Sequence, residues 1–420
     1  MWSPLKALAA SDFSRKTAHS LLTRFALLGS EFVVNVLVAR VLGPEGRGLF
    51  AVANALSGAI TQVGMLGLHN ANTYFLARGG IAQGVLTANS LLIAVGIGLA
   101  GLCGAGAVAL WAPEWLPVTG LLLLLALFNA PVQLLQFLLL GLLQGAQRVY
   151  RSNHIEVVAR VTQIVLVGGL ILAGILAPES LLAVAVVAAG LGAALAWFSL
   201  SSADSRLRVC LADLRTSLGY GLKSYASAVL GFLVLRTDVL LINWFLGSEQ
   251  TGQYAVAVTL INGLYVLPTT LSHMAFIKLV SVPEWADRLR LVIRVCGLSA
   301  LLMTLTVLGA AWAASGIFPL LFGEAFAGAA GAFVCLLPGL WIWSIETVIR
   351  KLYTTDGYAS WVVWAWACAF LTNIVLNIVL IPRMGIVGAA MASSIALGVV
   401  ALWTFIAFLR DPRRRVARAG

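Results

Sequence analysis

The sequence predicts an all-α polytopic membrane protein with about twelve transmembrane helices, arranged as two six-helix repeats. Composition is the first observation: 61% of the residues are hydrophobic and only 10% are charged, too little polar surface for a water-soluble globule of 420 residues. The second is that apolar runs of roughly 20 residues, enough to span a bilayer as a helix, recur along the whole chain. The third is an internal repeat, which indicates two equivalent halves.

The apolar runs are continuous stretches of Leu, Ala, Val and Gly. Because they lack the alternation of the roughly ten-residue strands of a membrane barrel, we expect helices. The opening stretch MWSPLKALAASDFSRKTAHS is polar and basic, and no small-residue cleavage site follows the first apolar run, so the first span is expected to remain and to set the orientation. In chain order the predicted spans are 18–41, 49–68, 85–111, 118–144, 154–177, 181–202, 220–246, 253–277, 291–313, 326–349, 359–381 and 386–409.

The internal repeat has a constant offset of 204 residues, since residues 42–56 read LGPEGRGLFAVANAL and residues 246–260 read LGSEQTGQYAVAVTL. The same offset relates Pro178 to Pro382. Each repeat therefore holds six spans, and because six is even both copies enter the membrane in the same direction, around a symmetry axis along the membrane normal. We expect a cytoplasmic N-terminal segment at 1–17, an N-lobe at 18–202, a cytoplasmic linker at 203–219, a C-lobe at 220–409 and a basic cytoplasmic tail at 410–420.

The repeated LGxExxG motif is interpreted as a tight turn on the outer side of the membrane. Gly43 and Gly247 can adopt the left-handed conformation that ends a helix, and Glu45 and Glu249 lie near the next helix N-terminus, where negative charge is favoured. On this interpretation the motif clamps a hairpin and binds no ligand.

The net charge of +11 is distributed on alternate connections rather than in one patch. This is the positive-inside pattern, so both termini are predicted to be cytoplasmic, the span number is predicted to be even, and nucleic acid is not expected as a partner. The opposite side holds only Arg47 and Arg383. The basic residues of the cytoplasmic side are Lys6, Arg15, Lys16, Arg78, Arg148, Arg151, Arg206, Arg208, Arg215, Lys278, Arg288, Arg290, Arg350, Lys351, Arg410, Arg413, Arg414, Arg415 and Arg418.

Several kinds of chemistry lack their motifs. The sequence contains no GxxxxGK[ST] loop for nucleotide hydrolysis, and its five cysteines are scattered with no CxxC and no histidine at metal-ligand spacing. Because the predicted outer loops are only a few residues long, they leave little room for the catalytic domain of a glycan-processing enzyme. We therefore expect no enzyme activity, no cofactor and no metal site.

Charged residues at the centre of membrane helices cost roughly 2.5 to 3.5 kcal/mol each, so each needs a reason. Span one contains Arg24, Glu31 and Asn35 on one face, and span seven contains Arg236 and Asp238, with Asn243 on the face of Arg236. The offset makes these two spans equivalent helices, expected to face each other across a central cavity. The deep charges either bind substrate or a coupling ion, or form ion pairs between helices.

Further polar residues are candidates for the cavity or its mouth. Asn129, Gln133 and Gln136 form one stripe on span four, which predicts either a water-lined cavity wall or interhelical hydrogen bonds. The equivalent His69 and His273, together with Arg78, are expected at the cytoplasmic mouth, although solvated loop positions explain the histidines as well. Glu156 and Arg160 form a pair four residues apart that is interpreted as structural.

Four stretches carry a family resemblance: VARVLGPEGRGLFAVANAL, GLLQGAQRVYRSN, RTDVLLINWFLGSEQTGQYAVAVTL and LIPRMGIVGAAMASS. Taken together, in this order and over nearly the whole chain, they resemble the polysaccharide transporter family of the multidrug/oligosaccharidyl-lipid/polysaccharide (MOP) superfamily. The resemblance implies a V-shaped pair of six-helix lobes. These would carry an undecaprenyl-diphosphate-linked oligosaccharide across the bacterial cytoplasmic membrane by alternating access, for O-antigen, capsule or exopolysaccharide synthesis.

The resemblance also implies roles for particular residues. The cavity is expected to be cationic, with Arg236 and then Arg24 binding the diphosphate, and with Glu31 and Asp238 holding these arginines or titrating during coupling to H⁺ or Na⁺. Membrane lipids, a polysaccharide polymerase and chain-length proteins are the implied partners. Twelve spans disfavour the peptidoglycan-precursor flippases, which usually have fourteen, and the single deep arginine of span one argues against a multi-arginine clamp. The alternatives are a multidrug and toxin exporter of the same fold, and a membrane enzyme or accessory protein of the same pathway.

Overall fold

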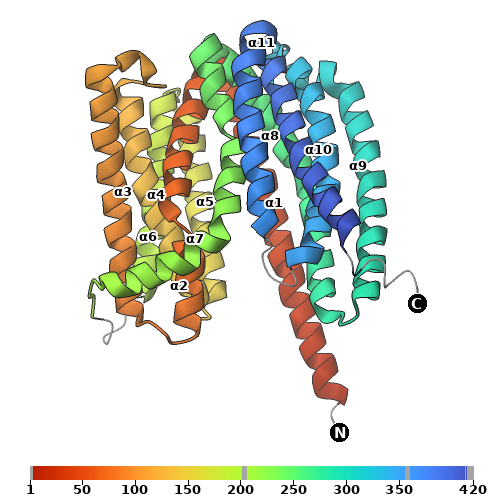
Figure 1. The fold of residues 1–420 in the computed structure, drawn as a ribbon. Helices are drawn as coiled ribbons and strands as arrows, with labels where there is room; N and C mark the ends of the chain where they lie inside the picture. Colours follow the sequence, from red (N-terminus) through yellow and green to blue (C-terminus); the bar gives the residue numbers. More distant parts are fainter. Residues whose placement is uncertain (1–2, 201–205, 355–359, 412, 414–420) are drawn as a thin grey trace.

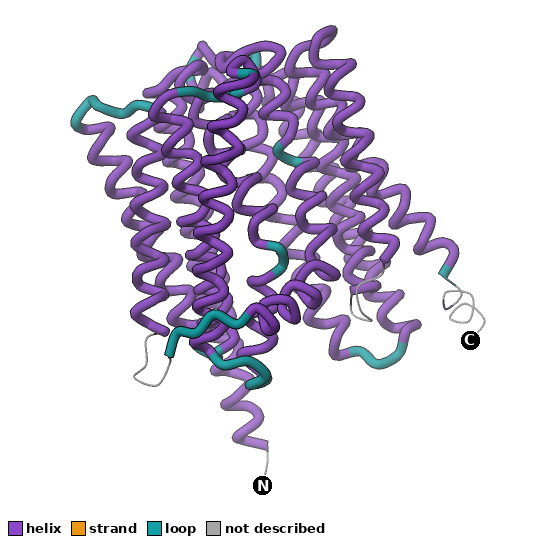
Figure 2. Tube along the Cα trace, turned by 60° about the vertical axis from the view of Figure 1, so that its left-hand side comes forward, coloured by secondary structure: helices purple, strands orange, loops and turns teal. Residues whose placement is uncertain are grey.

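The computed structural model describes residues 3–200, 206–354, 360–411 and 413, without the side chains of 3–28, 223, 224 and 354. Over this part of the chain every regular element is a helix, and nine helices are long and apolar enough to cross a membrane (Figures 1 and 2). The helices are α1 (Ser3–Met65), α2 (Leu68–Ala77), α3 (Gln83–Trp111), η1 (Pro113–Trp115), α4 (Gly120–Gly145), α5 (Val149–Leu172), α6 (Pro178–Leu200), α7 (Leu211–Val234), α8 (Thr237–Ser281), α9 (Trp285–Phe322), η2 (Glu324–Phe326), α10 (Ala329–Thr354) and α11 (Ser360–Arg410).

The twelve predicted spans fit into these nine helices because three of the helices are interrupted by a glycine. Gly43 in α1, Gly247 in α8 and Gly385 in α11 have φ values of 67°, 82° and 62°, so each of these helices contains parts of two predicted spans. The positive φ predicted for Gly43 and Gly247 is confirmed. Their ψ values are −178° and 179°, extended rather than left-handed helical, in a region essentially restricted to glycine.

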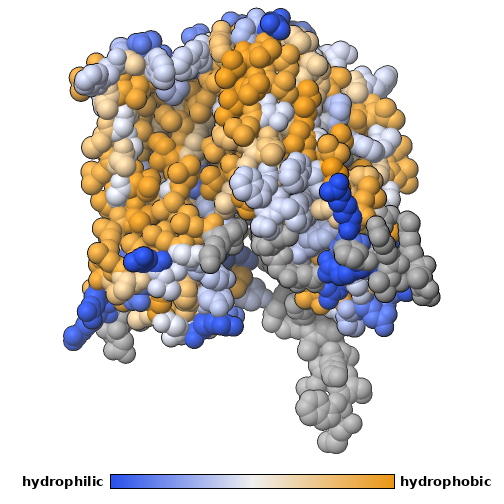
Figure 3. All heavy atoms as spheres, viewed as in Figure 1, coloured by the Kyte–Doolittle hydropathy of each residue, from blue (hydrophilic) through white to orange (hydrophobic). Residues whose placement is uncertain are grey.

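The helices form two lobes (Figure 1). In the N-lobe α4 packs against α2, α3 and α6, and in the C-lobe α10 packs against α8, α9 and α11. The start of α1 lies at one end of the bundle, here called the terminal face (Figure 1). The end at which Gly43 and Gly247 interrupt α1 and α8 is called the hairpin face. Apolar side chains cover the middle of the visible surface, and hydrophilic residues gather at its two ends (Figure 3), as expected for a chain that crosses a bilayer.

The two repeated motifs pack directly against each other at the hairpin face. A Cβ atom at Gly48 would overlap the Ser248 carbonyl and lie 2.9 Å from the Gly252 nitrogen, and a Cβ at Gly252 would overlap the Pro44 carbonyl. The 204-residue offset relates Pro44 to Ser248 and Gly48 to Gly252, so this contact obeys the symmetry of the repeat. The motif therefore does more than turn the chain: its second glycine allows the other lobe's backbone to approach.

Span seven is interrupted, and α7 begins earlier than the predicted C-lobe. Its first half packs on the N-lobe: Leu214 joins the apolar cluster of α2, α3 and α4, the Tyr220 ring stacks on Tyr74 with centroids 4.4 Å apart, and the Tyr225 hydroxyl donates to the Gln62 carbonyl. Its second half packs on α11 of the C-lobe. The predicted lobe boundary at 220 thus falls within a helix that bridges the lobes, because hydropathy records depth in the membrane and not the packing partner.

Candidate functional site: a cavity between the lobes

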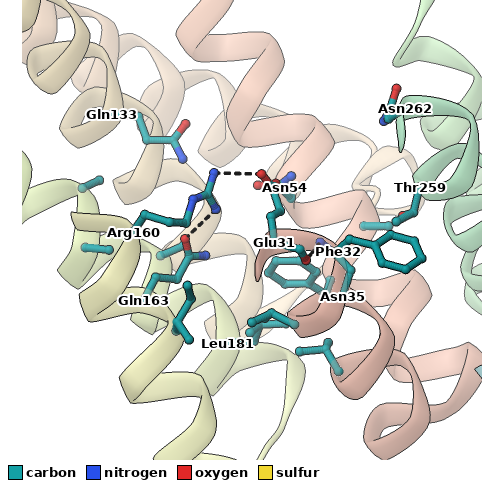
Figure 4. Close-up of a pocket in the computed structure, with 18 of the residues that line it drawn as sticks. Glu31, Phe32, Asn35, Asn54, Gln133, Arg160, Gln163, Leu181, Thr259 and Asn262 are labelled. Carbon is teal, nitrogen blue, oxygen red and sulfur yellow. Dashed lines mark hydrogen bonds and ion pairs between the residues drawn. The ribbon is translucent and has the colours of Figure 1, made fainter. Parts of the chain in front are cut away.

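A cavity of about 820 Å³ lies between the lobes, lined by α1, α4, α5, α6 and α8 and by Arg236 (Figure 4). Val239 lines the cavity from the first part of α8, and in the part of α8 that follows Gly247 the lining begins at Ala255, past the Gly48–Gly252 contact. The two lobes therefore meet between the cavity and the hairpin face. The polar lining residues are Glu31, Asn35, Arg47, Asn54, Gln133, Gln136, Glu156, Arg160, Gln163, Arg236, Thr259 and Asn262.

An ion pair joins α5 to α1 at the cavity wall. Arg160 lies 3.1 Å from a carboxylate oxygen of Glu31 and also donates to Gln163 at 3.0 Å (Figure 4). The two charged side chains are 34% and 43% exposed, so both remain accessible from the cavity. Glu31 is thus paired, but with Arg160, which the sequence analysis interpreted as the structural partner of Glu156. The partner was missed because it depends on how α5 packs on α1.

Arg47 was assigned to an outer loop, but it lies in α1 one turn beyond Gly43 and is 6% exposed. Its guanidinium donates to the Asn35 side chain at 2.9 Å and to the Thr259 hydroxyl at 3.4 Å, so it connects α1 with α8 at the cavity wall. Its Nε has no hydrogen-bond partner among the described residues. Because the helix resumes directly after Gly43, this arginine enters the membrane region, and helix continuation at Pro44 is the sequence signal that would have found it.

Arg236 lies at the break of span seven, between α7 and α8. It is the N-cap of α8 and lines the cavity. Within the described part of the chain, none of the hydrogen bonds or ion pairs involves its guanidinium. A helix N-terminus and an arginine therefore contribute positive potential to the same place, an arrangement that suits an anionic group.

Asp238 does not face the cavity, although it follows Arg236 by only two residues. It is 2% exposed and accepts hydrogen bonds from the Tyr254 hydroxyl and, at 3.2 Å, from the Ser393 hydroxyl. These bonds turn its carboxylate into the C-lobe, so no hydrogen bond holds it to Arg236. Beside it, Asn373 donates to Ser393 at 3.3 Å and Asn377 donates to Asn373 at 3.0 Å.

Two other predicted cavity residues are placed elsewhere. Asn129 is fully buried and donates to the Ser57 hydroxyl at 2.9 Å, because the second half of α1 covers α4 at that level. The structure thus favours the interhelical hydrogen bond over the cavity wall for this residue. Asn243 donates to the Pro117 carbonyl at 2.8 Å, which connects the lobes outside the cavity. Asn35, Gln133 and Gln136 do line the cavity.

The predicted mouth residues lie outside the cavity lining. The His69 ring nitrogen is 2.8 Å from the Phe137 carbonyl, a contact within the N-lobe, and His273 is exposed on α8. Arg78 lies over the Tyr74 ring at 4.9 Å and so extends the stack that joins α2 to α7. The Arg24 side chain lies outside the described residues. Among the described residues, no three His, Cys, Asp or Glu side chains are grouped to hold a metal ion.

Comparison with known proteins identifies the family. Residues 14–275, more than half of the chain, match the polysaccharide biosynthesis protein family. The chain belongs to this family. A curated relative, the probable low-salt glycan biosynthesis flippase Agl15 of Haloferax volcanii, is 23% identical over 411 residues, which cover 92% of this chain and 82% of the relative.

Solved structures share the fold of this polysaccharide biosynthesis family member. A lipid II flippase MurJ in an inward closed conformation matches with a TM-score of 0.72 and 14% identity, over 94% of this chain and 88% of that one. An inward-facing multidrug resistance MATE transporter of the MOP superfamily matches with a TM-score of 0.71 and 16% identity, over 93% and 94% of the two chains. The predicted two-lobe fold and the predicted family resemblance are confirmed.

Proposed function

We infer that this protein is a flippase that carries a lipid-linked oligosaccharide, attached through a diphosphate to a polyprenol, across the bacterial cytoplasmic membrane by alternating access. The observation that carries the proposal is the cavity between the lobes, lined by Arg47, Arg160 and Arg236 and by side-chain amides. The terminal face is assigned to the cytoplasm because, by the positive-inside rule, the connections rich in lysine and arginine are expected on the cytoplasmic side, together with both termini. Membership of the polysaccharide biosynthesis family supports the choice of a glycan substrate.

The arginines suit a diphosphate for a physical reason. A diphosphate in bare hydrocarbon would bear a prohibitive desolvation cost, and guanidinium groups replace its hydration with charge-assisted, often bidentate, hydrogen bonds. Arg236 faces the cavity, and no hydrogen bond or ion pair to another described residue engages its guanidinium, so its donors are available to such a group. The amides of Gln133, Gln136 and Asn262, also on the cavity wall, can bond sugar hydroxyls.

Alternating access requires a contact that breaks at each face. At the hairpin face, the Gly48–Gly252 contact must separate for the cavity to open outward. At the terminal face, a Cβ at Gly221 would lie 2.7 Å from the Gly67 carbonyl carbon, so the first half of α7 packs closely on the N-cap residue of α2. The two lobes rocking about the cavity would open these contacts in turn.

Asp238 is the residue proposed to couple transport to H⁺ or Na⁺. Its buried carboxylate accepts from the Tyr254 and Ser393 hydroxyls, and the amides of Asn373 and Asn377 continue this network from Ser393. The Asn377 side-chain oxygen has no partner among the described residues. A proton or a small cation that binds here would neutralise a charge that is costly at this depth.

A multidrug exporter of the same fold is the second candidate, since the MATE transporter is as similar in fold as the flippase. An organic cation would require a predominantly acidic cavity. Here three arginines face two glutamates, and one of those glutamates is paired with Arg160. This balance favours an anionic substrate.

The test uses the full chain reconstituted in vesicles with a fluorescent undecaprenyl-diphosphate oligosaccharide. Arg236→Ala is expected to slow translocation at least about tenfold, since a charge-assisted hydrogen bond contributes roughly 1.5 to 3 kcal/mol. Arg383→Ala is the matched control, because it removes an exposed arginine of the same lobe that does not line the cavity. Equal rates for Arg236→Ala and the parent, with both folded, would contradict the role of Arg236. Sugar transfer by the purified protein would support the enzyme alternative instead.

A further inference from the structure

A second hollow, of about 370 Å³, lies between α1 and α5 and is almost entirely apolar. Its walls are formed by residues 30–37 of α1 and 164–171 of α5, with Val34 and Leu37 on one side and Ile164 and Ile171 on the other. We call it the α1–α5 groove. Val33 borders it with 55% of its surface exposed, so the groove lies at the lipid-facing surface of the bundle.

The groove is continuous with the central cavity. Val34 and Ile164 line both spaces. One helical turn from these residues toward the terminal face are Glu31 and Arg160, whose ion pair joins the same two helices. The passage from a charged, water-compatible site to an apolar, lipid-facing groove thus takes a single turn of each helix.

Gly168 leaves room along the wall of the groove. A Cβ atom built on it would meet no atom within 4 Å, and the same holds for its neighbour Gly169, which does not line the groove. A Cβ atom can therefore be added at either position without displacing a neighbour, and only the side chain at position 168 would start from the wall of the groove.

We propose that the α1–α5 groove binds the polyprenyl chain of the lipid-linked glycan while its diphosphate and sugars occupy the central cavity. This rests on the function proposed above. A diphosphate at Arg160 and Arg236 is covalently attached to a long apolar chain, and that chain must leave the cavity into lipid. The Gly48–Gly252 contact blocks the hairpin face, so the exit is lateral, and the groove is the apolar route that begins at the arginines.

The physical preference follows from the two surfaces. In the central cavity the apolar side chains lie among charged and amide groups that water must solvate, whereas the valine, leucine and isoleucine side chains of the groove give a polyprenyl chain dispersion contacts and keep it out of water. The proposal also assigns the Glu31–Arg160 pair to the junction between tail and headgroup. There a diphosphate can replace Glu31 as the partner of Arg160.

The test compares Gly168→Leu with Gly169→Leu in the reconstituted full chain. Gly168→Leu is expected to slow translocation of the undecaprenyl-diphosphate oligosaccharide about tenfold, the effect of excluding roughly two methylenes of tail contact. It is expected to leave the affinity for the same oligosaccharyl diphosphate without a lipid unchanged. Gly169→Leu is expected to match the parent in both measurements. If Gly168→Leu translocates the undecaprenyl-diphosphate oligosaccharide as fast as the parent does, the proposal is wrong.

Photocrosslinking identifies the occupant. An undecaprenyl-diphosphate sugar with a diazirine on its isoprenoid chain is expected to label residues 30–37 and 164–171, and unlabelled substrate should reduce that labelling. If a diazirine phospholipid labels these residues equally and the lipid-linked sugar does not displace it, the groove is a general lipid site and the proposal is wrong. If the parent neither binds the lipid-free headgroup nor moves the lipid-linked sugar, the proposed function is wrong. If the parent does both and Gly168→Leu translocates as fast as the parent, only the assignment of the groove is wrong.

Discussion

Replacing Gly48 with alanine would disturb the contact that closes the hairpin face. An added Cβ overlaps the Ser248 carbonyl and approaches the Gly252 nitrogen to 2.9 Å, and both are backbone atoms that cannot rotate away. Overpacking of this kind typically costs about 1 to 3 kcal/mol. The cost falls only on the conformation in which the lobes touch, so the ratio of the closed conformation to the conformation open at this face should drop by roughly fivefold to 160-fold.

Spin labels on the exposed positions of the two motifs measure this change. Cysteines introduced at Glu45 and Glu249, in a background without the native cysteines, report the distance between the hairpins by double electron–electron resonance. Gly48→Ala should shift the distribution to longer distances, and Gly252→Ala should do the same because it meets the Pro44 carbonyl in the symmetric position. Combining the two should add little, since both act on one contact.

Gly104→Ala is the matched control for this experiment, because a Cβ there meets nothing within 4 Å on α3. It should leave the distance distribution unchanged. An unchanged distribution for both Gly48→Ala and Gly252→Ala would refute the reasoning that close backbone approach is what the repeated motif provides.

Three further predictions concern the charged and amide residues. Glu31→Gln removes the carboxylate that pairs with Arg160, so the lipid-free oligosaccharyl diphosphate should bind several-fold more tightly, as measured by calorimetry. Weaker binding would mean that Glu31 positions Arg160 for the ligand. Asp238→Asn should leave that binding unchanged but make vesicle translocation independent of an imposed H⁺ or Na⁺ gradient, and persistence of the gradient dependence would exclude Asp238 as the coupling residue. Asn129→Leu should lower the melting temperature, because the Ser57 hydroxyl loses a buried partner at a cost of about 1 to 3 kcal/mol, and should leave translocation by the folded protein unchanged. Slowed translocation at unchanged stability would instead mean that Asn129 acts at the cavity wall.

The fold was predictable because the bilayer imposes a length on each crossing. Runs of about 20 apolar residues predict where helices cross, and glycines with positive φ explain why the crossings merge into fewer continuous helices. The pairing of the repeats was also informative, since it directed attention to Glu31 and Arg236, which both line the cavity. What hydropathy could not predict is that the first half of α7 packs on the N-lobe, because its apolar face could cover either lobe.

The remaining site residues depend on packing over long sequence separations. Arg160 and Glu31 are 129 residues apart, and no local spacing connects them. Asn129 shares a helix face with Gln133, yet Gln133 faces the cavity and Asn129 is covered by the second half of α1, where it donates to Ser57. Asp238 turns away from Arg236 because Tyr254 and Ser393 donate to it from inside the C-lobe. Depth alone identifies costly charges, and only the tertiary structure identifies their partners.

The proposed substrate of the cationic cavity between the lobes is a diphosphate-linked glycan lipid. Its most direct test is translocation of a fluorescent undecaprenyl-diphosphate oligosaccharide by the reconstituted parent chain, measured beside uptake of the organic cation tetraphenylphosphonium. We expect the lipid-linked glycan to move, Arg236→Ala to slow it, Arg383→Ala to leave its rate unchanged, and the cation not to be transported. Transport of the cation with no movement of the glycan lipid would contradict it.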